Sequence, residues 1–269
     1  MSKADASIHP SSVVEDGAVL GEGVQIGPFC HVGAQVQLGN GVKLLSHVSV
    51  QGDTAIGDET RAFPFAAIGG EPQDLKYAGE PVKLVIGERC TIREGVTMNP
   101  GTGGDRSITT VGNNCTFLAN SHVAHDCIVG NNVIFSNNVM LAGHCTVGDN
   151  VIFGGGSGAH QFCRIGHHAF IGGLAGVEGD VLPFGMALGN RADLAGLNLI
   201  GMKRAGFERE SIHLVRGVYK SLFAGDAPVQ EKAEELRKQA TDPLVIEILE
   251  FVLASADRAL CTPATAPTG

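Results

Sequence analysis

Three short motifs bring together side chains that could carry out proton transfer. The chain has ten histidines, and most of the candidates stand in the strings SHVAHDC, AGHC and GAHQF. An imidazole exchanges protons near neutral pH because its unperturbed pKa is about 6.5, which suits a general base. A glycine lets its backbone N–H come close to a developing oxyanion. The candidates are His122, His125, Asp126, Gly143, His144, His160 and Gln161.

A six-residue period must position these side chains. Apolar residues recur at every sixth position over 14–68, 86–98 and 111–177, and a small or medium residue usually stands two positions earlier. About 25 hexads fit, which indicates a repeat architecture. Each hexad is one short strand and a turn, and three hexads make a coil of about 18 residues. Because one coil cannot bury its own core, coils must stack about 4.8 Å apart, and we predict a parallel β-helix.

Residues 18 apart lie directly above one another in such a coil. His125 therefore lies under Gly143, and Asp126 lies under His144. Histidines on neighbouring coils could hold zinc or nickel, as in some β-helix enzymes, but the sequence pattern of those enzymes is not evident here. We favour a general base and predict no metal site.

Two segments interrupt the repeat, and the hexads stop near residue 190. The β-helix is predicted over residues 1–190, with projecting loops at 69–83, where Asp74 and Glu80 fall at interior phases, and at 101–107, where GTGGDRS shifts the phase. Such loops often carry binding groups. An α-helical domain is predicted over 191–260, with helices at 209–225, 230–240 and 243–260. A disordered tail is predicted over 261–269.

Composition narrows the class of protein. The chain has 38 Gly, no Trp and only 5% aromatic residues, so we expect small side chains in the core. A net charge of −9 argues against nucleic acid as the main partner. No apolar run approaches the roughly 20 residues of a membrane helix, and no signal peptide is visible, so we expect a cytoplasmic protein without membrane insertion. Six cysteines fall at interior positions of the repeat, and we predict that they pack in the core as free thiols rather than form disulfides. They are Cys30, Cys90, Cys115, Cys127, Cys145 and Cys163.

Longer strings carry a more specific resemblance. HVAHDC, LAGH, HQF, QDLKYAGEP and GLNLIGMKRAGF closely resemble the UDP-N-acetylglucosamine acyltransferases, which catalyse the first step of lipid A biosynthesis. The resemblance covers nearly the whole chain. It implies a left-handed β-helix and a homotrimer with the active-site cleft between adjacent prisms.

The same resemblance implies a reaction and the residues that perform it. The donor is a (3R)-3-hydroxyacyl group on acyl carrier protein, whose own phosphopantetheine makes a separate cofactor unnecessary. The acceptor is the 3-position of UDP-N-acetylglucosamine. His125 is the implied base, Asp126 orients or stabilises its ring, and the Gly143 N–H holds the oxyanion. Matches to substrate-contacting residues are Asp74, Lys76, His122, His144, His160 and Gln161, together with Asn198 and Arg204, which reach the nucleotide from a neighbouring subunit.

Gly173 falls where the family sets acyl-chain length, and by this resemblance a glycine there leaves the groove open to a chain of about 12–14 carbons. The chain departs from better-known members at Asn99, Pro100, Ile200 and Ala205. The last two departures affect the expected uridine contacts, and the first two leave the acceptor atom open, because some members acylate a 3-amino sugar.

Other hexapeptide proteins remain alternatives. One is the later N-acyltransferase of the same pathway, which normally has a separate N-terminal domain, whereas these repeats begin near residue 8. An acetyl-CoA enzyme is a second alternative, and a non-catalytic scaffold or carbonic-anhydrase-like metal protein is a third.

Overall fold

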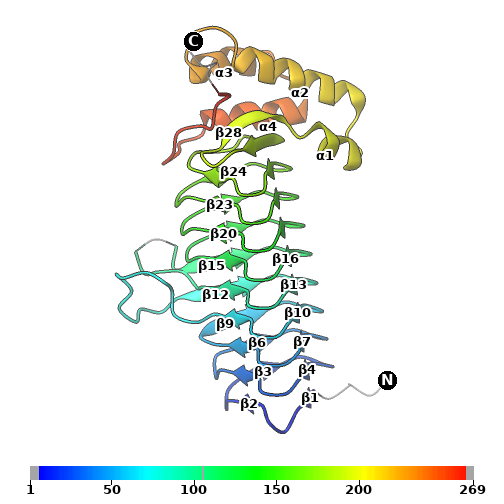
Figure 1. The fold of residues 1–269 in the computed structure, drawn as a ribbon, viewed down its shortest axis with the longest axis vertical. Coiled ribbons are helices and arrows are strands. Elements are labelled where there is room, and N and C mark those ends of the chain that lie inside the picture. The colour runs from blue at the N-terminus through cyan, green and yellow to red at the C-terminus, as the bar shows by residue number, and fades with distance from the viewer. Residues whose placement is uncertain (1–5, 105, 265–269) are drawn as a thin grey trace.

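The computed structural model describes residues 6–104 and 106–264 and consists of a three-sided prism with helices over one end (Figure 1). Its short strands form three sheets, each running along one side of the prism. The predicted parallel β-helix is confirmed, since each strand from β1 to β27 pairs in parallel with a strand one coil away.

Strand bounds follow the hexads closely. The first sheet contains β1 (Ser7–Ile8), β4 (Gln25–Ile26), β7 (Lys43–Leu44), β10 (Arg61–Ala62), β13 (Thr91–Ile92), β16 (Thr116–Phe117), β19 (Ile134–Phe135), β22 (Ile152–Phe153), β25 (Phe170–Ile171), β27 (Gly185–Leu188) and β28 (Asp193–Leu197). The second contains β2 (Val13–Val14), β5 (His31–Val32), β8 (Ser49–Val50), β11 (Ala67–Ile68), β14 (Thr97–Met98), β17 (His122–Val123), β20 (Met140–Leu141), β23 (Gly158–Ala159) and β26 (Gly176–Val177). The third contains β3 (Val19–Leu20), β6 (Gln37–Leu38), β9 (Asp53–Ile56), β12 (Lys83–Ile86), β15 (Ile108–Val111), β18 (Ile128–Val129), β21 (Thr146–Val147) and β24 (Arg164–Ile165).

The core is built from the inward residue of each strand and the residue two positions earlier. The six cysteines predicted at interior positions are buried and free, as is Cys261. The expectation of small core side chains is wrong in the middle of the prism. There Phe117, Phe135 and Phe153 are fully buried in one column, with ring centroids 5.1 and 4.8 Å apart. A column of phenylalanines fits in the core because the coils that hold Phe117, Phe135 and Phe153 are stacked on one another, so each large ring packs against another large ring.

Both interruptions of the repeat fall between strands. Arg61 pairs with Thr91, 30 residues later, because the chain leaves the prism after Ile68 and returns at Lys83. Thr91 pairs with Thr116, 25 residues later, because the run 101–107 is inserted before β15. Figure 1 shows these excursions on one side of the prism.

The regular coils end before residue 190. β27 is followed by β28, which pairs with it antiparallel and extends the first sheet past the expected end of the β-helix. Four helices then follow among the described residues: α1 (Leu199–Arg204), α2 (Arg209–Leu222), α3 (Val229–Arg237) and α4 (Pro243–Leu253). The sequence analysis did not predict α1 or β28. No helix within 6–104 and 106–264 has the length and apolarity to cross a membrane.

The C-terminal segment differs from its prediction. The helix expected to reach residue 260 ends at Leu253, and Ala254 is extended. Residues 254–262, which we call the C-terminal strap, run back to the prism. The Asp180 N–H donates to Ala259, and the Cys261 N–H donates to Asp180. Cys261 is buried, so the predicted disordered tail is wrong at its first residue, and residues 265–269 of that tail lie outside the described residues.

Candidate active site

The candidate residues lie at one corner of the prism, in the turns that follow β17, β20 and β23. His125, Gly143 and Gln161 occupy equivalent positions in three consecutive coils. Asp126, His144 and Phe162 occupy the next position, where all three have a positive φ of 58–67°. Backbone bonds from His144 N to His125 O (3.0 Å) and from Phe162 N to Gly143 O (3.1 Å) hold the turns together. This is the stacking that the 18-residue spacing predicts.

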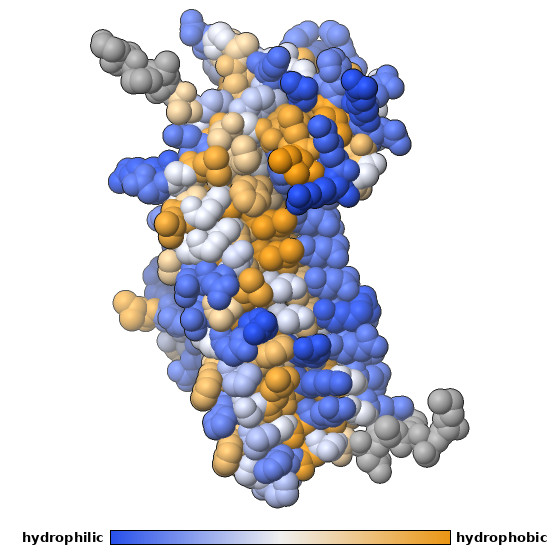
Figure 2. Space-filling model, turned by 45° about the vertical axis from the view of Figure 1, so that its right-hand side comes forward, coloured by the Kyte–Doolittle hydropathy of each residue, from blue (hydrophilic) through white to orange (hydrophobic). Residues whose placement is uncertain are grey.

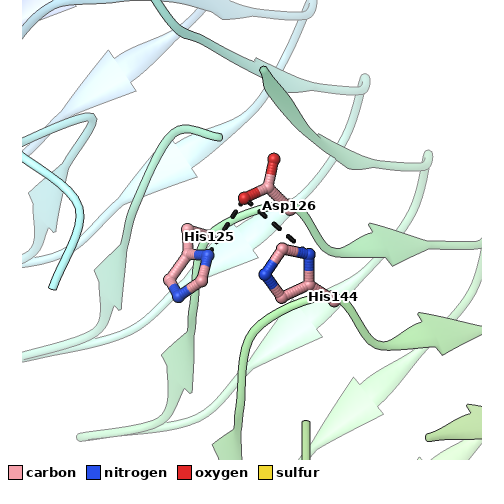
Figure 3. Close-up of side chains that lie close together, drawn as sticks. All are labelled: His125, Asp126 and His144. Atoms are coloured by element: carbon pink, nitrogen blue, oxygen red, sulfur yellow. Dashed lines mark hydrogen bonds and ion pairs between the residues drawn. The ribbon is translucent and has the colours of Figure 1, made fainter. Parts of the chain in front are cut away.

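His125 and Asp126 form a buried pair (Figure 3). The His125 Nδ1 lies 3.0 Å from the Asp126 Oδ2. A carboxylate only accepts hydrogen bonds, so Nδ1 carries the proton and Nε2 has its lone pair free for another proton. The pair thus has the tautomer that a general base requires.

The loop at 101–107 completes the surroundings of Asp126. The Thr102 N–H donates to both carboxylate oxygens at 3.1 and 3.0 Å, and the Thr102 hydroxyl donates to Oδ2 at 2.6 Å. Arg106 donates to the Asp126 carbonyl. Burial by itself raises the pKa of the Asp126 carboxyl, but the bonds from Thr102 and His125 outweigh it and hold that pKa below its ordinary value. Asp126 therefore stays ionised beside His125.

His144 stands above Asp126. Its Nδ1 lies 4.0 Å from the Asp126 Oδ2, its ring meets the His125 ring edge-on at 4.9 Å, and it stacks on Phe162 at 4.5 Å. His125, Asp126 and His144 each offer one ligand atom within 4.8 Å of the others, so they could approach a metal ion. The bond from His125 to Asp126 occupies one of these nitrogens and leaves the His125 Nε2 to accept a proton.

Gly143 makes room for the His125 ring. A Cβ at this position would lie 2.5 Å from the His125 Cε1 and 2.7 Å from its Nε2. Among the described residues, no acceptor bonds the Gly143 N–H. A free donor therefore stands beside the free nitrogen of His125, on the wall of the same groove.

That groove has a volume of about 720 Å³ and follows the second sheet. His122, His125, Gly143, His160 and Gln161 all line it, and apolar groups such as Met140 and Leu174 extend it along the prism. His122 lies 2.7 Å from the Thr97 hydroxyl, and burial lowers the pKa of its ring, which favours the neutral form.

A second cavity of about 600 Å³ lies on the other side of the His125–His144 contact. Asp74 and Lys76 from the 69–83 loop line it together with His144. The Lys76 N–H donates to the Asp74 carboxylate at 3.0 Å. The two cavities thus divide the predicted substrate residues into two groups that meet near the pair of His125 and Asp126.

Three predicted residues lie apart from these cavities in the described chain. Asn198 caps α1 by accepting from the Gly201 N–H, and it donates to the His168 carbonyl. Arg204 is exposed in the last turn of α1. Gly173 lies in the exposed turn before Leu174, where an added Cβ would contact only Gly155 O, at 3.5 Å. A single chain does not bring Asn198 or Arg204 to His125.

The departures from the family pattern have structural positions of their own. Asn99 is buried and donates to the carbonyls of Gly70 and Glu71, so it supports the base of the 69–83 loop. Pro100 lines a different cavity, under that loop. Ile200 is 66% exposed on α1, and Ala205 caps that helix.

Several residues of the site were missed by the sequence analysis. Gln73 and Thr97 line the groove, Thr102 and Arg106 hold Asp126, and Arg258 from the C-terminal strap contacts His160. Gln73 stands beside Asp74 in a quoted motif, and the 101–107 loop had been expected to carry binding groups. No sequence signal connects Arg258 with His160, because 98 residues separate them.

Comparison with known proteins places the chain in a family. The family described as "Udp N-acetylglucosamine O-acyltransferase; Domain 2" matches residues 180–261, and that described as "Bacterial transferase hexapeptide (six repeats)" matches residues 108–143. The acyl-[acyl-carrier-protein]–UDP-N-acetylglucosamine O-acyltransferase of Rhizobium johnstonii is 56% identical over 98% of this chain and 97% of its own length. That of Mesorhizobium japonicum is 58% identical over 97% of this chain and 94% of its own.

Solved structures agree over the same length. A crystal structure of a UDP-N-acetylglucosamine acyltransferase superposes with a TM-score of 0.93 at 40% identity, covering 96% of this chain and all of that one. The Acinetobacter baumannii structure gives a TM-score of 0.91 at 40% identity, covering 94% and 98%. The chain therefore belongs to the UDP-N-acetylglucosamine O-acyltransferase family.

Proposed function

We propose that this protein transfers a (3R)-3-hydroxyacyl group from acyl carrier protein to the 3-hydroxyl of UDP-N-acetylglucosamine, the first step of lipid A biosynthesis, with His125 as general base. One observation supports this most strongly. His125 offers a free Nε2 to the groove, and the unbonded Gly143 N–H lies beside it. The names of the relatives described above specify an acyl carrier protein as the donor and O-acylation of UDP-N-acetylglucosamine.

The reaction follows from this arrangement. The His125 Nε2 removes the proton of the acceptor hydroxyl while the hydroxyl oxygen bonds to the thioester carbonyl carbon. The carbonyl electrons move onto its oxygen, and the Gly143 N–H stabilises that oxyanion. When the C=O re-forms, the C–S bond breaks and the proton on Nε2 passes to the leaving sulfur. The ionised Asp126 stabilises the imidazolium that exists between these steps.

The two cavities suggest how the substrates divide between them. The 720 Å³ groove has apolar walls at Met140 and Leu174, which suit an acyl chain. The 600 Å³ cavity holds Lys76 and Arg106, which suit a nucleotide diphosphate. His125 and His144 stand where the two meet.

The active unit in this proposal is a homotrimer. Figure 2 shows apolar side chains in a vertical band along the prism. Exposed large hydrophobic residues include Phe29 (61%), Phe65 (66%), Met140 (59%) and Leu174 (78%), which a neighbouring prism would cover. Asn198 and Arg204, distant from His125 in one chain, would then contact the nucleotide bound against the adjacent chain.

A 3-amino UDP-sugar is the second candidate acceptor. Asn99 and Pro100, which depart from the family pattern, do not distinguish a sugar hydroxyl from a sugar amine as the acceptor. The Asn99 amide donates to carbonyls of the 69–83 loop and not to a group in the groove.

One product assay tests the function and the acceptor together. The protein is incubated with 3-hydroxyacyl carrier proteins of several lengths and with either UDP-N-acetylglucosamine or its 3-amino analogue, with and without a chelator. We expect a base-labile ester from the ordinary sugar, unaffected by the chelator. A base-stable amide made only from the amino sugar would change the acceptor, and no product from either sugar would reject the proposal.

Gly173→Met is expected to shorten the preferred acyl chain. The backbone there accepts a side chain, and an added Cβ meets only one atom within 4 Å, so methionine fits at this position, next in sequence to Leu174 on the groove wall, where we expect it to block the far end of the acyl chain. Each CH₂ excluded from the groove removes about 0.8 kcal/mol of burial, or roughly fourfold in kcat/KM. The measurement is kcat/KM across donor lengths, with Gly173→Ala as the matched control. Unchanged selectivity in the methionine variant would remove Gly173 as the determinant of chain length.

A further inference from the structure

The C-terminal strap reaches the groove through one arginine. Arg258 donates from Nε to the Gln161 carbonyl at 2.8 Å, and its Nη2 lies 2.6 Å from the His160 Nδ1. Both partners belong to the turn after β23, one coil beyond Gly143. Backbone bonds to Asp180 fix the strap on either side of Leu260, so Arg258 is held by the fold rather than by a free chain end.

The contact determines which nitrogen of His160 carries the proton. Arginine has five N–H donors, no acceptor, and stays protonated. At 2.6 Å the His160 Nδ1 must therefore be the acceptor, and Nε2 carries the hydrogen. The alternative, donation from Nδ1 to the Gln161 carbonyl, spans 3.4 Å, which is beyond ordinary hydrogen-bond length, and Arg258 already donates to that oxygen.

His160 and His125 thus have opposite roles on one groove. The carboxylate of Asp126 accepts a hydrogen bond from the His125 Nδ1–H, and this leaves the Nε2 lone pair free, as a base requires. The guanidinium of Arg258 occupies the Nδ1 lone pair of His160 and leaves an Nε2–H, as a donor requires. The partner at Nδ1 decides in each case whether the other nitrogen accepts or donates.

We propose that Arg258 is a positioning residue, which fixes His160 as a hydrogen-bond donor toward an acceptor oxygen of the bound acyl substrate. The substrate in this statement rests on the proposed function, but the tautomer does not. The strap is therefore part of the active site.

The test combines a spectroscopic and a kinetic measurement on the full chain. In protein labelled with ¹⁵N-histidine, the His160 signals are assigned by their loss in His160→Gln. We expect a protonated Nε2 and an unprotonated Nδ1 in the wild type, a mixture of tautomers in Arg258→Met, and the wild-type pattern in Arg258→Lys, since an ammonium also only donates.

Kinetically, Arg258→Met is expected to lower kcat/KM about 2- to 12-fold, the effect of one hydrogen bond, mostly through a higher KM for the acyl donor. In a His160→Gln background the same change should have little further effect, within about twofold. The matched control is Arg237→Met, which removes an exposed ion pair with Glu250 elsewhere in the C-terminal region and should leave activity unchanged.

Either of two results would overturn the proposal. One is an Nδ1–H tautomer of His160 in the wild type. The other is a loss from Arg258→Met that persists in full in the His160→Gln background, which would assign Arg258 to anchoring the strap. A wild-type protein with the expected tautomer but no acyl transfer would reject the proposed function and leave the tautomer assignment intact.

Discussion

Replacing His125 with alanine is expected to lower kcat/KM by about 10²- to 10⁴-fold, the contribution of a positioned general base. His125 is the residue of the corner whose Nδ1 proton is directed at the ionised Asp126 and whose Nε2 faces the groove. His144, 4.0 Å from the same carboxylate oxygen, lines the other cavity and is not expected to replace it. The measurement is steady-state kinetics together with the melting temperature.

The control for this experiment is His31→Ala. His31 also projects from the second sheet, but four strands away, which corresponds to about 19 Å. It bonds to Glu15 near the surface and should lose no activity. If His125→Ala kept turnover within about tenfold of the wild type and melted at the same temperature, His125 would not be the base.

Gly143→Ala is expected to lower kcat by about 10²- to 10³-fold without unfolding the protein. The new methyl group would lie 2.5 Å from the His125 Cε1, so either the ring or the turn must shift. Misplacement of a catalytic group by about 1 Å can cost about 10²-fold, and a turn that shifts also carries the Gly143 N–H away from the oxyanion, whose stabilisation is worth about 10²- to 10³-fold. The φ of Gly143 is not in the left-handed region, so alanine causes no backbone strain there.

A matched glycine separates this effect from a general cost of alanine in the turns. Gly33 follows β5 in the same sheet, and its nearest neighbour to an added Cβ is 3.5 Å away, so Gly33→Ala should be active and equally stable. A Gly143→Ala enzyme with wild-type kcat would show that the His125 ring can move without loss.

The sequence by itself determined the scaffold and the register of the corner that holds His125 and Asp126. A period of six is a local property, and three hexads make a coil whatever the distant chain does, so the spacing of 18 already placed His125 under Gly143 and Asp126 under His144. The same periodicity located both insertions, since interior positions occupied by Asp74 and Glu80 exclude a strand. The resemblance supplied the roles assigned to these residues.

Only the tertiary structure decided what contacts the corner from outside the repeat. The 101–107 loop has no periodicity that would direct Thr102 onto Asp126, and the bonds that hold this carboxylate ionised follow from how the loop folds back. The end of α4 was misjudged because apolar and helix-forming residues continue past Leu253, whereas pairing with Asp180 draws residues 259–261 into extended conformation. That pairing joins segments about 80 residues apart, so local sequence preferences could not reveal that it brings Arg258 to His160.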